Sequence, residues 1–309
     1  MIYIDFVNNK EEVLNEYENT YNKFLKKIII FFRNRTNYIV VAKTEFGEII
    51  KIQNSNAITL NKLKELLKIN SIKTVCLSDK FKDKEKIYKI LEEKNIKLIK
   101  GDELKKYLLR EAIEYICKNK CENMYEQEIS FLVKKNNFLI NCSIRDISKK
   151  VKNINIITQN PKQFKILENN LYEKEGIILN ITDNFKKSLV KSNIIINIDF
   201  SNEEINKYII PKYCCLINLQ NEMIKINKKG FEGININNFK YVVNEKYIKN
   251  RLQNFNKEVF YESLIIRNSN PENILNKIKK DNVKVVEVYG KNGIISKKEF
   301  EKLKRKIFS

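Results

Sequence analysis

Short apolar runs alternate with helix-like segments across residues 126–220, and this alternation constrains the fold more than any other feature of the chain. Ile194, Ile195 and Ile196 are apolar at successive positions, as in strands that are buried on both faces. Strands that are separated by crossover segments in this way predict a doubly wound parallel sheet. The expected strands cover residues 129–134, 153–158, 177–181, 193–199 and 214–219.

Helix signals fall between these runs. Residues 160–161, Asn-Pro, combine a capping residue with a proline in the first turn, and Gly176 provides a stop for the same helix. Residues 201–204, Ser-Asn-Glu-Glu, have the pattern of a capping box. The first helix of the region begins at Asn137 or at Asn141. Each expected crossover therefore has its own start signal.

Residues 1–120 predict a small N-terminal α/β domain. Its first half contains a short strand at residues 1–6, a helix over residues 10–25, and neighbouring antiparallel strands at residues 28–32, 38–43 and 48–53. Its second half alternates strand and helix, which predicts a parallel unit that ends in one long helix from Asp102 through Ile116.

Residues 121–225 then form the Rossmann-like domain, and residues 226–309 form a basic C-terminal α+β segment that packs back on the earlier domains. Helices are expected at residues 271–280 and 297–308, with a strand at residues 283–289. The predicted fold class is thus α/β, with a small N-terminal α/β domain, a doubly wound parallel Rossmann-like sheet and a C-terminal α+β tail.

The central region resembles the NAD(P)-binding Rossmann domain. The resemblance rests on residues 158–161, Thr-Gln-Asn-Pro, on residues 181–183, Ile-Thr-Asp, and on Pro211 before the strand at residues 214–219. It is most similar to the version found in shikimate dehydrogenase and glutamyl-tRNA reductase, and it covers about 95 residues. The resemblance implies a cofactor at the turn after the first strand of this domain.

Two features of that family are missing. Its members carry G-x-G-x-x-G after the first strand, so that the backbone can approach a pyrophosphate at the helix N-terminus. Here residues 133–138 read Val-Lys-Lys-Asn-Asn-Phe, without glycine. Thr158 stands where an NAD-binding member has an acidic residue for the ribose. The sequence therefore predicts a degenerate core without a bound cofactor.

Candidate site residues follow from the same resemblance. Lys134 and Lys135 flank a helix start, where an anion is favoured, and Asn137 and Thr158 lie in the cofactor region. Asp199 stands at the carboxyl end of the fourth strand, where open α/β sheets place ligand contacts. These five residues are the predicted cofactor-binding set, and the sequence assigns no catalytic residue.

The chain has no histidine, which excludes histidine-based acid–base catalysis, nucleophile activation and imidazole ligation of metals. Cysteine pairs occur at Cys117 and Cys121 and at residues 214–215, and neither spacing meets the requirement of a zinc site. No metal is predicted. Cys142 lies at a helix start, where a thiolate is favoured, but no base partner is apparent, so a bystander thiol is the leading interpretation.

The formal net charge of +21 favours a polyanion as partner, but only seven of the 59 basic residues are arginine. An A/T-rich genome explains such a lysine excess without any functional cause. The basic tail, residues 251–309, contains 14 basic and seven acidic residues and thus a third of the excess charge. No signal peptide and no apolar run of membrane-spanning length occurs, so a cytoplasmic protein without a membrane partner is expected.

Three functional hypotheses result. The leading one is a non-catalytic protein with a degenerate Rossmann-like core that acts as a scaffold, sensor or partner-binding protein. Its partner is expected to be a protein or a small molecule in preference to a nucleic acid. The alternatives are an NAD(P)-dependent oxidoreductase with an atypical cofactor turn and a nucleic-acid-binding protein that uses its basic tail.

Overall fold

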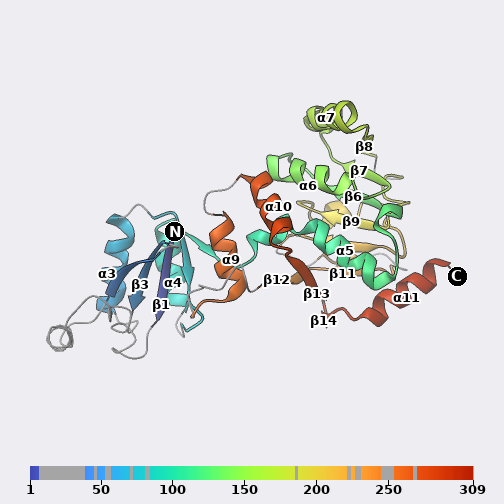
Figure 1. Ribbon diagram of the computed structural model, residues 1–309. Helices are drawn as coiled ribbons and strands as arrows, with labels where there is room; N and C mark the ends of the chain where they lie inside the picture. The colour runs from blue at the N-terminus through green and yellow to red at the C-terminus, as the bar shows by residue number, and fades with distance from the viewer. Residues whose placement is uncertain are drawn as a thin grey trace. The chain divides into compact units, whose positions relative to one another are not determined.

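A computed structural model gives the architecture of the chain (Figure 1). Its described residues divide by their contacts into two compact units, Met1–Leu104 with Glu245–Asn268 and Lys105–Asn244 with Ser269–Ser309. The predicted division at residues 120 and 225 stays a prediction. The structure describes residues 1–6, 39–44, 47–52, 57–69, 72–80, 84–184, 187–220, 224–226, 231–244, 254–266 and 270–308. The helix expected at residues 10–25 and the strand expected at residues 28–32 lie outside these ranges.

In the first unit, five described strands pair in the order β2-β3-β1-β4-β5. The β2–β3 pair is antiparallel, as predicted, whereas β1 pairs in parallel with both β3 and β4. The sequence predicted the strand β1 but not its two parallel partners. The strands are β1 (Ile2–Phe6), β2 (Ile39–Thr44), β3 (Gly47–Ile52), β4 (Thr74–Leu77) and β5 (Lys97–Ile99).

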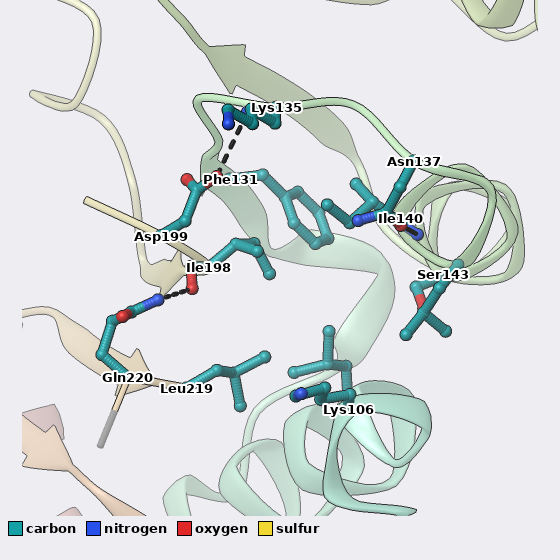
Figure 2. A pocket seen from close by; sticks show the side chains of 12 residues that line it. Lys106, Phe131, Lys135, Asn137, Ile140, Ser143, Ile198, Asp199, Leu219 and Gln220 are labelled. Atoms are coloured by element: carbon teal, nitrogen blue, oxygen red, sulfur yellow. Dashed lines mark hydrogen bonds between the residues drawn. The ribbon is translucent and has the colours of Figure 1, made fainter. Parts of the chain in front are cut away.

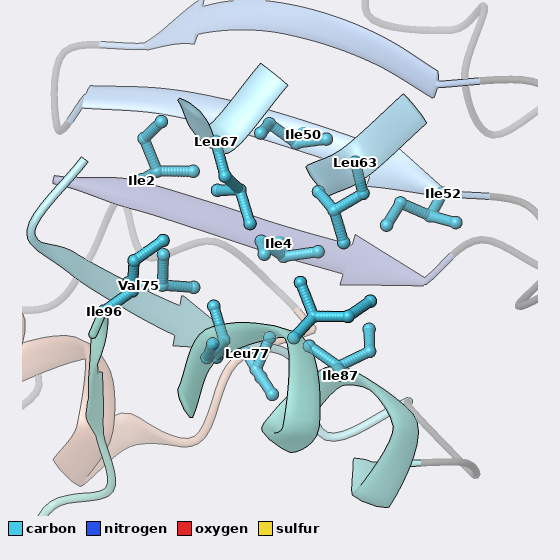
Figure 3. Packing of buried hydrophobic residues seen from close by; sticks show 12 residues of the cluster. Ile2, Ile4, Ile50, Ile52, Leu63, Leu67, Val75, Leu77, Ile87 and Ile96 are labelled. Carbon is cyan, nitrogen blue, oxygen red and sulfur yellow. The ribbon is translucent and has the colours of Figure 1, made fainter. Parts of the chain in front are cut away.

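One face of this sheet carries the apolar residues that alternate along its central strands. Ile2 and Ile4 of β1 contribute to a buried cluster together with Leu63 of α3 (Ala57–Ile69) and Ile87 of α4 (Lys84–Glu93) (Figure 3). Side chains in a strand alternate between the two faces of its sheet. Tyr3 must therefore project from the opposite face.

That opposite face is covered by α9 (Lys257–Ile266), which comes from far along the chain. The Tyr3 hydroxyl lies 2.8 Å from Ser263 Oγ, and the Tyr3 ring meets Phe255 edge to face with 5.5 Å between ring centroids. Sequence reasoning missed α9 because its residues 260–263 are all buried, so it lacks the apolar stripe of a surface helix.

Glu262 of α9 anchors the chain that follows β5. It is fully buried, and its carboxylate accepts hydrogen bonds from the backbone N–H groups of Gly101 (3.2 Å) and Leu104 (2.8 Å). Burial raises the pKa of Glu262 to about 7, although these two hydrogen bonds act in the opposite direction.

The long helix expected from Asp102 is broken into two pieces. A short 3-10 helix, η2 (Glu103–Tyr107), is followed by α5 (Leu109–Lys120), and Leu108 between them has non-helical dihedral angles, φ −99° and ψ 21°. The apolar spacing that indicated one helix continues across the break, because Leu104, Leu108 and Ala112 are all buried.

In the second unit, six described strands pair in parallel in the order β11-β10-β9-β6-β7-β8. Numbered along the unit, this is the order 3-2-1-4-5-6 of the doubly wound dinucleotide-binding fold, so the predicted fold class is confirmed. The strands are β6 (Glu128–Leu132), β7 (Asn153–Ile157), β8 (Leu179–Thr182), β9 (Ile194–Asn197), β10 (Cys215–Asn218) and β11 (Ile234–Ile236).

The edge strand β11 was not expected from the sequence. It is short, and Gly233 precedes it in close contact with β10, since a Cβ added to Gly233 would lie 2.2 Å from the carbonyl oxygen of Cys214. The apolar run in this segment is too short to predict a strand from the sequence.

The crossover helices follow the start signals in the sequence. Asn137 caps α6 (Phe138–Ser148), and Gly176 ends α7 (Lys165–Glu175) in the left-handed conformation. Pro161 opens the 3-10 helix η4 (Pro161–Phe164), and Ser201 forms the predicted capping box of α8 (Asn202–Ile205). The connection that contains α8 packs on the face of the sheet that bears Leu132, Ile157, Ile195 and Leu216.

The end of the chain adds an antiparallel sheet and two helices to the second unit. The described strands β12 (Asn238–Val242), β13 (Lys284–Gly290) and β14 (Gly293–Ile294) pair in this order. The helices α10 (Pro271–Lys280) and α11 (Lys297–Phe308) match the two predicted helices. Within the described part of the chain, no helix is both long and apolar enough to cross a membrane.

We predict that Glu262 makes the protein less stable as the pH rises. The pKa of Glu262 is about 7 in the folded protein and 4.5 for an ordinary glutamate, so between these values the folded state retains a proton that the unfolded chain releases. The free energy of unfolding should therefore fall, by about 1–3 kcal/mol, as the pH rises from about 4.5 to about 7. Glu262→Gln does not titrate and should show a shallower fall in urea unfolding.

The matched control is Glu173→Gln, which removes the same charge from an exposed position on α7 and should keep the wild-type pH dependence. An unchanged pH dependence in Glu262→Gln would contradict the assignment.

Candidate functional site

A pocket of about 340 Å³ lies at the carboxyl ends of the central strands of the second unit (Figure 2). Phe131 near the end of β6, Ile198 after β9 and Leu219 after β10 contribute to its wall. The chain passes from β8 to β9 by crossing to the other side of β6, so β6 and β9 flank the point where the strand order reverses. Open α/β sheets bind their ligands in the crevice at this point.

The wall of the pocket is divided evenly between apolar and polar residues. The apolar residues are Leu109, Phe131, Leu139, Ile140, Ile198 and Leu219, and the polar residues are Lys106, Lys135, Asn137, Ser143, Asp199 and Gln220. An apolar wall with a few polar groups is typical of small-molecule sites, whose volumes are roughly 300–1,000 Å³. This pocket lies at the lower end of that range.

The turn between β6 and α6 is held by a carboxylate from the neighbouring strand. Asp199 accepts hydrogen bonds from the backbone N–H of Lys134 (2.6 Å) and from that of Lys135 (3.1 Å). The Asn137 side chain accepts a hydrogen bond from the backbone N–H of Ile140 at the start of α6 (2.9 Å). The backbone donors that would face a pyrophosphate in a dinucleotide-binding protein thus have acceptors within the chain.

Gln163 of η4 holds the same turn from its other side. Its side-chain oxygen accepts a hydrogen bond from the backbone N–H of Asn136 (2.8 Å), and its amide nitrogen donates to the carbonyl of Lys134 (2.7 Å). The Asn136 side chain in turn donates to the carbonyl of Gln163 (2.7 Å). Sequence reasoning did not identify Gln163, because no motif links it to a turn so distant along the chain.

Thr158 faces this hydrogen-bond network and not the pocket. It is fully buried, and its hydroxyl oxygen accepts hydrogen bonds from the Gln163 side chain (3.0 Å) and from the backbone N–H of Asn160 (3.3 Å). The position that holds a ribose in the resembled family is therefore occupied by contacts within the chain.

Lys134 also has partners outside the pocket. Its Nζ lies 2.5 Å from Glu204 of α8 and 6.0 Å from the centre of the Phe200 ring. Burial raises the pKa of Glu204, but the hydrogen bonds from Lys134 and Ser201 outweigh burial and leave this pKa below its ordinary value. Of the five predicted residues, Lys135, Asn137 and Asp199 line the pocket, whereas Lys134 and Thr158 do not. Their role in cofactor binding stays a prediction.

Asparagine side chains order the sheet edge beside the pocket. Asn197 at the end of β9 donates a hydrogen bond to the Asn218 side chain at the end of β10 (3.0 Å), and Asn218 accepts one from the backbone N–H of Gln220 (3.2 Å). The Gln220 side chain donates to the carbonyl of Ile198, which Figure 2 draws as a dashed line. These bonds position the residues after both strands.

Three polar residues of the pocket were missed by sequence reasoning: Lys106, Ser143 and Gln220. Ser143 lies on α6, is 4% exposed, and its hydroxyl has no hydrogen-bond partner among the described residues. A serine within an amphipathic helix carries no signal that separates a buried wall residue from a surface residue.

The pocket does not contain an activated nucleophile among the residues described. Cys142 lies on α6 beside Ser143, and burial raises the pKa of its thiol, which disfavours the reactive thiolate. Both Asp199 oxygens accept backbone hydrogen bonds, and no base is bonded to Ser143. The described residues also contain no cluster of acidic and cysteine side chains suited to a metal ion.

No protein-family model and no curated protein sequence matches the chain. Solved structures with some similarity include an L-tryptophan dehydrogenase from Nostoc punctiforme, with a TM-score of 0.33 and 8% identity over 99% of this chain and 87% of that one. They also include a shikimate 5-dehydrogenase from Listeria monocytogenes in complex with shikimate and NAD (0.27, 8%, 70% and 77%). A third is an aspartate transcarbamoylase from Trypanosoma cruzi in complex with phosphate (0.30, 8%, 89% and 82%).

We predict that Asp199 maintains the turn after β6. Asp199→Ala would leave the backbone N–H groups of Lys134 and Lys135 without their acceptor, which should lower the free energy of unfolding by about 1–3 kcal/mol. Amide hydrogen exchange of these two residues should become faster. Asp183→Ala, at an exposed position after β8, is the control and should change neither quantity. Unchanged exchange at Lys134 and Lys135 would refute the role given to Asp199.

Proposed function

We propose that this chain is a non-catalytic sensor with a degenerate Rossmann-like core. It binds a small molecule in the pocket at the point where the strand order reverses, between β6 and β9. The observation that carries the proposal is the hydrogen bonding of the Asp199 carboxylate to the backbone N–H groups of Lys134 and Lys135. An internal anion thus takes the place that a cofactor phosphate takes in a dinucleotide-binding fold.

Electrostatics and geometry both oppose a dinucleotide at this turn. A pyrophosphate would bring its negative charge beside Asp199, and like charges at close distance are strongly unfavourable. The turn also carries a side chain at each position from 133 to 138, and Gln163 fixes its backbone from the other side. Binding would require the loss of several hydrogen bonds before any new one could form.

The pocket next to this closed turn remains large enough for a small ligand. Its volume of about 340 Å³ is bounded by six apolar and six polar residues, a composition that suits an amphipathic molecule. A binding role is favoured over catalysis because Cys142 has a raised pKa and because Ser143 has no bonded base among the described residues. The oxidoreductase and nucleic-acid hypotheses remain alternatives without a specific contact in their favour.

Calorimetry with dinucleotides tests the proposal directly. We expect no saturable binding of NAD⁺, NADH or NADP⁺ to the wild-type protein at concentrations up to about 1 mM. Micromolar binding of any of them would overturn the proposal, because it would show that the turn accepts a cofactor.

A gain-of-binding variant tests its physical cause. Asp199→Ala removes the internal anion, so inorganic pyrophosphate should bind this variant more tightly than the wild type, by about tenfold or more. Glu203→Ala removes the same charge from an exposed position on α8 and should bind pyrophosphate as the wild type does. Equal gains in both variants would show that net charge, and not the closed turn, excludes the anion.

A further inference from the structure

Ser143 is an unexplained feature of the pocket wall. Its side chain is 4% exposed, and its hydroxyl has no hydrogen-bond partner among the described residues. Burial of a hydroxyl without a hydrogen bond is unfavourable. Ser148, on the same helix and also buried, donates a hydrogen bond to the carbonyl of Arg145 (3.0 Å). Unlike the Ser148 hydroxyl, the Ser143 hydroxyl is thus available to a group of a bound molecule.

The position of Ser143 shows where such a partner would lie. Ser143 lines the pocket from α6, and Gln220 lines it from the end of β10 on the opposite side of the view in Figure 2. Phe131, Ile198 and Leu219 lie between them and present apolar surface. A rotation about the Cα–Cβ bond is enough to redirect a serine hydroxyl toward a bound group.

The charges around the pocket favour an anion. Lys106 and Lys135 line the wall, and Asp199 is the acidic residue of this wall. The two lysines and the one aspartate give the lining a net formal charge of +1, and both oxygens of Asp199 are bonded to the turn. Lys135 is exposed at the pocket, and its ammonium group has no ion-pair partner among the described residues.

We infer that the ligand of this pocket is a small organic monoanion with an apolar body, such as a ring-sized carboxylic acid. Its apolar body packs against Phe131, Ile198 and Leu219, its anionic group lies toward Lys135, and a polar substituent accepts or donates a hydrogen bond at Ser143. This inference rests on the proposed function and adds the chemical class of the ligand. A carboxylate also fits the volume, which is small for a dinucleotide.

The test uses matched pairs of probes: benzoate, 3-hydroxybenzoate and 4-hydroxyphenylacetate, each with its neutral primary amide. Binding is measured by ligand-observed NMR titration of the full chain. We expect at least one acid to bind with a dissociation constant below about 1 mM. The dissociation constant of its amide should be higher by a factor of about ten or more. If no acid binds more tightly than its amide, the inferred ligand class is wrong.

Variants assign the contacts. Ser143→Ala should weaken the binding of a hydroxylated acid about 3- to 10-fold, which is the range of one hydrogen bond, whereas Ser148→Ala should leave it unchanged. Lys135→Gln should reduce the preference for acid over amide, whereas Lys162→Gln, which removes the same charge from an exposed residue of η4, should preserve it. Equal binding by Ser143→Ala and the wild type would overturn the assignment of Ser143.

Thermal stability without ligand gives an independent readout. Ser143→Ala removes an unpartnered hydroxyl and should raise Tm by about 1–3 °C, whereas Ser148→Ala removes a satisfied hydroxyl and should lower it. A lower Tm in Ser143→Ala would show that this hydroxyl has a structural partner and would overturn the inference. If none of the acids binds, the inferred ligand class is wrong, but the expected absence of dinucleotide binding is not affected. The ligand class and the proposed function are therefore tested by different measurements.

Discussion

The hydrogen bonding of the Asp199 carboxylate to the backbone of the β6–α6 turn is the interaction around which the candidate site of the second unit is arranged. It links the residue after β9 to the turn after β6, and these are the two strands at which the sheet reverses its order. In a dinucleotide-binding protein this place belongs to a phosphate that arrives from solution. Here the Asp199 carboxylate accepts hydrogen bonds from the backbone N–H groups of Lys134 and Lys135.

The same principle explains the surroundings of the turn. Gln163 bonds to both sides of the turn backbone, Asn137 caps α6, and the Asn197–Asn218 pair orders the next two strand ends. Each of these groups would otherwise leave a buried or half-buried polar atom without a partner. The turn backbone thus has hydrogen-bond partners within the chain, whereas the Ser143 hydroxyl in the wall of the adjacent pocket has none among the described residues.

The candidate site was only partly predictable. Lys135, Asn137 and Asp199 were identified because the carboxyl end of a parallel sheet and the start of its first helix can be located from apolar runs and capping residues. Gln163 and Ser143 were not identified, because their importance depends on which atoms lie beside them. Lys134 and Thr158 were placed correctly along the chain, but their side chains bond to Glu204 and Gln163 and not to the pocket.

The sequence by itself determined the order of the strands from β6 to β10, the helix starts at Pro161 and Ser201, and the parallel α/β class, because these depend on local periodicity and on capping chemistry. Only the tertiary structure decided that β1 pairs in parallel with β3 and that α9 covers the second face of the first sheet. It alone also decided that Asp199 closes the turn. These features join residues that are far apart in the chain, and no local pattern specifies which distant donor meets which acceptor.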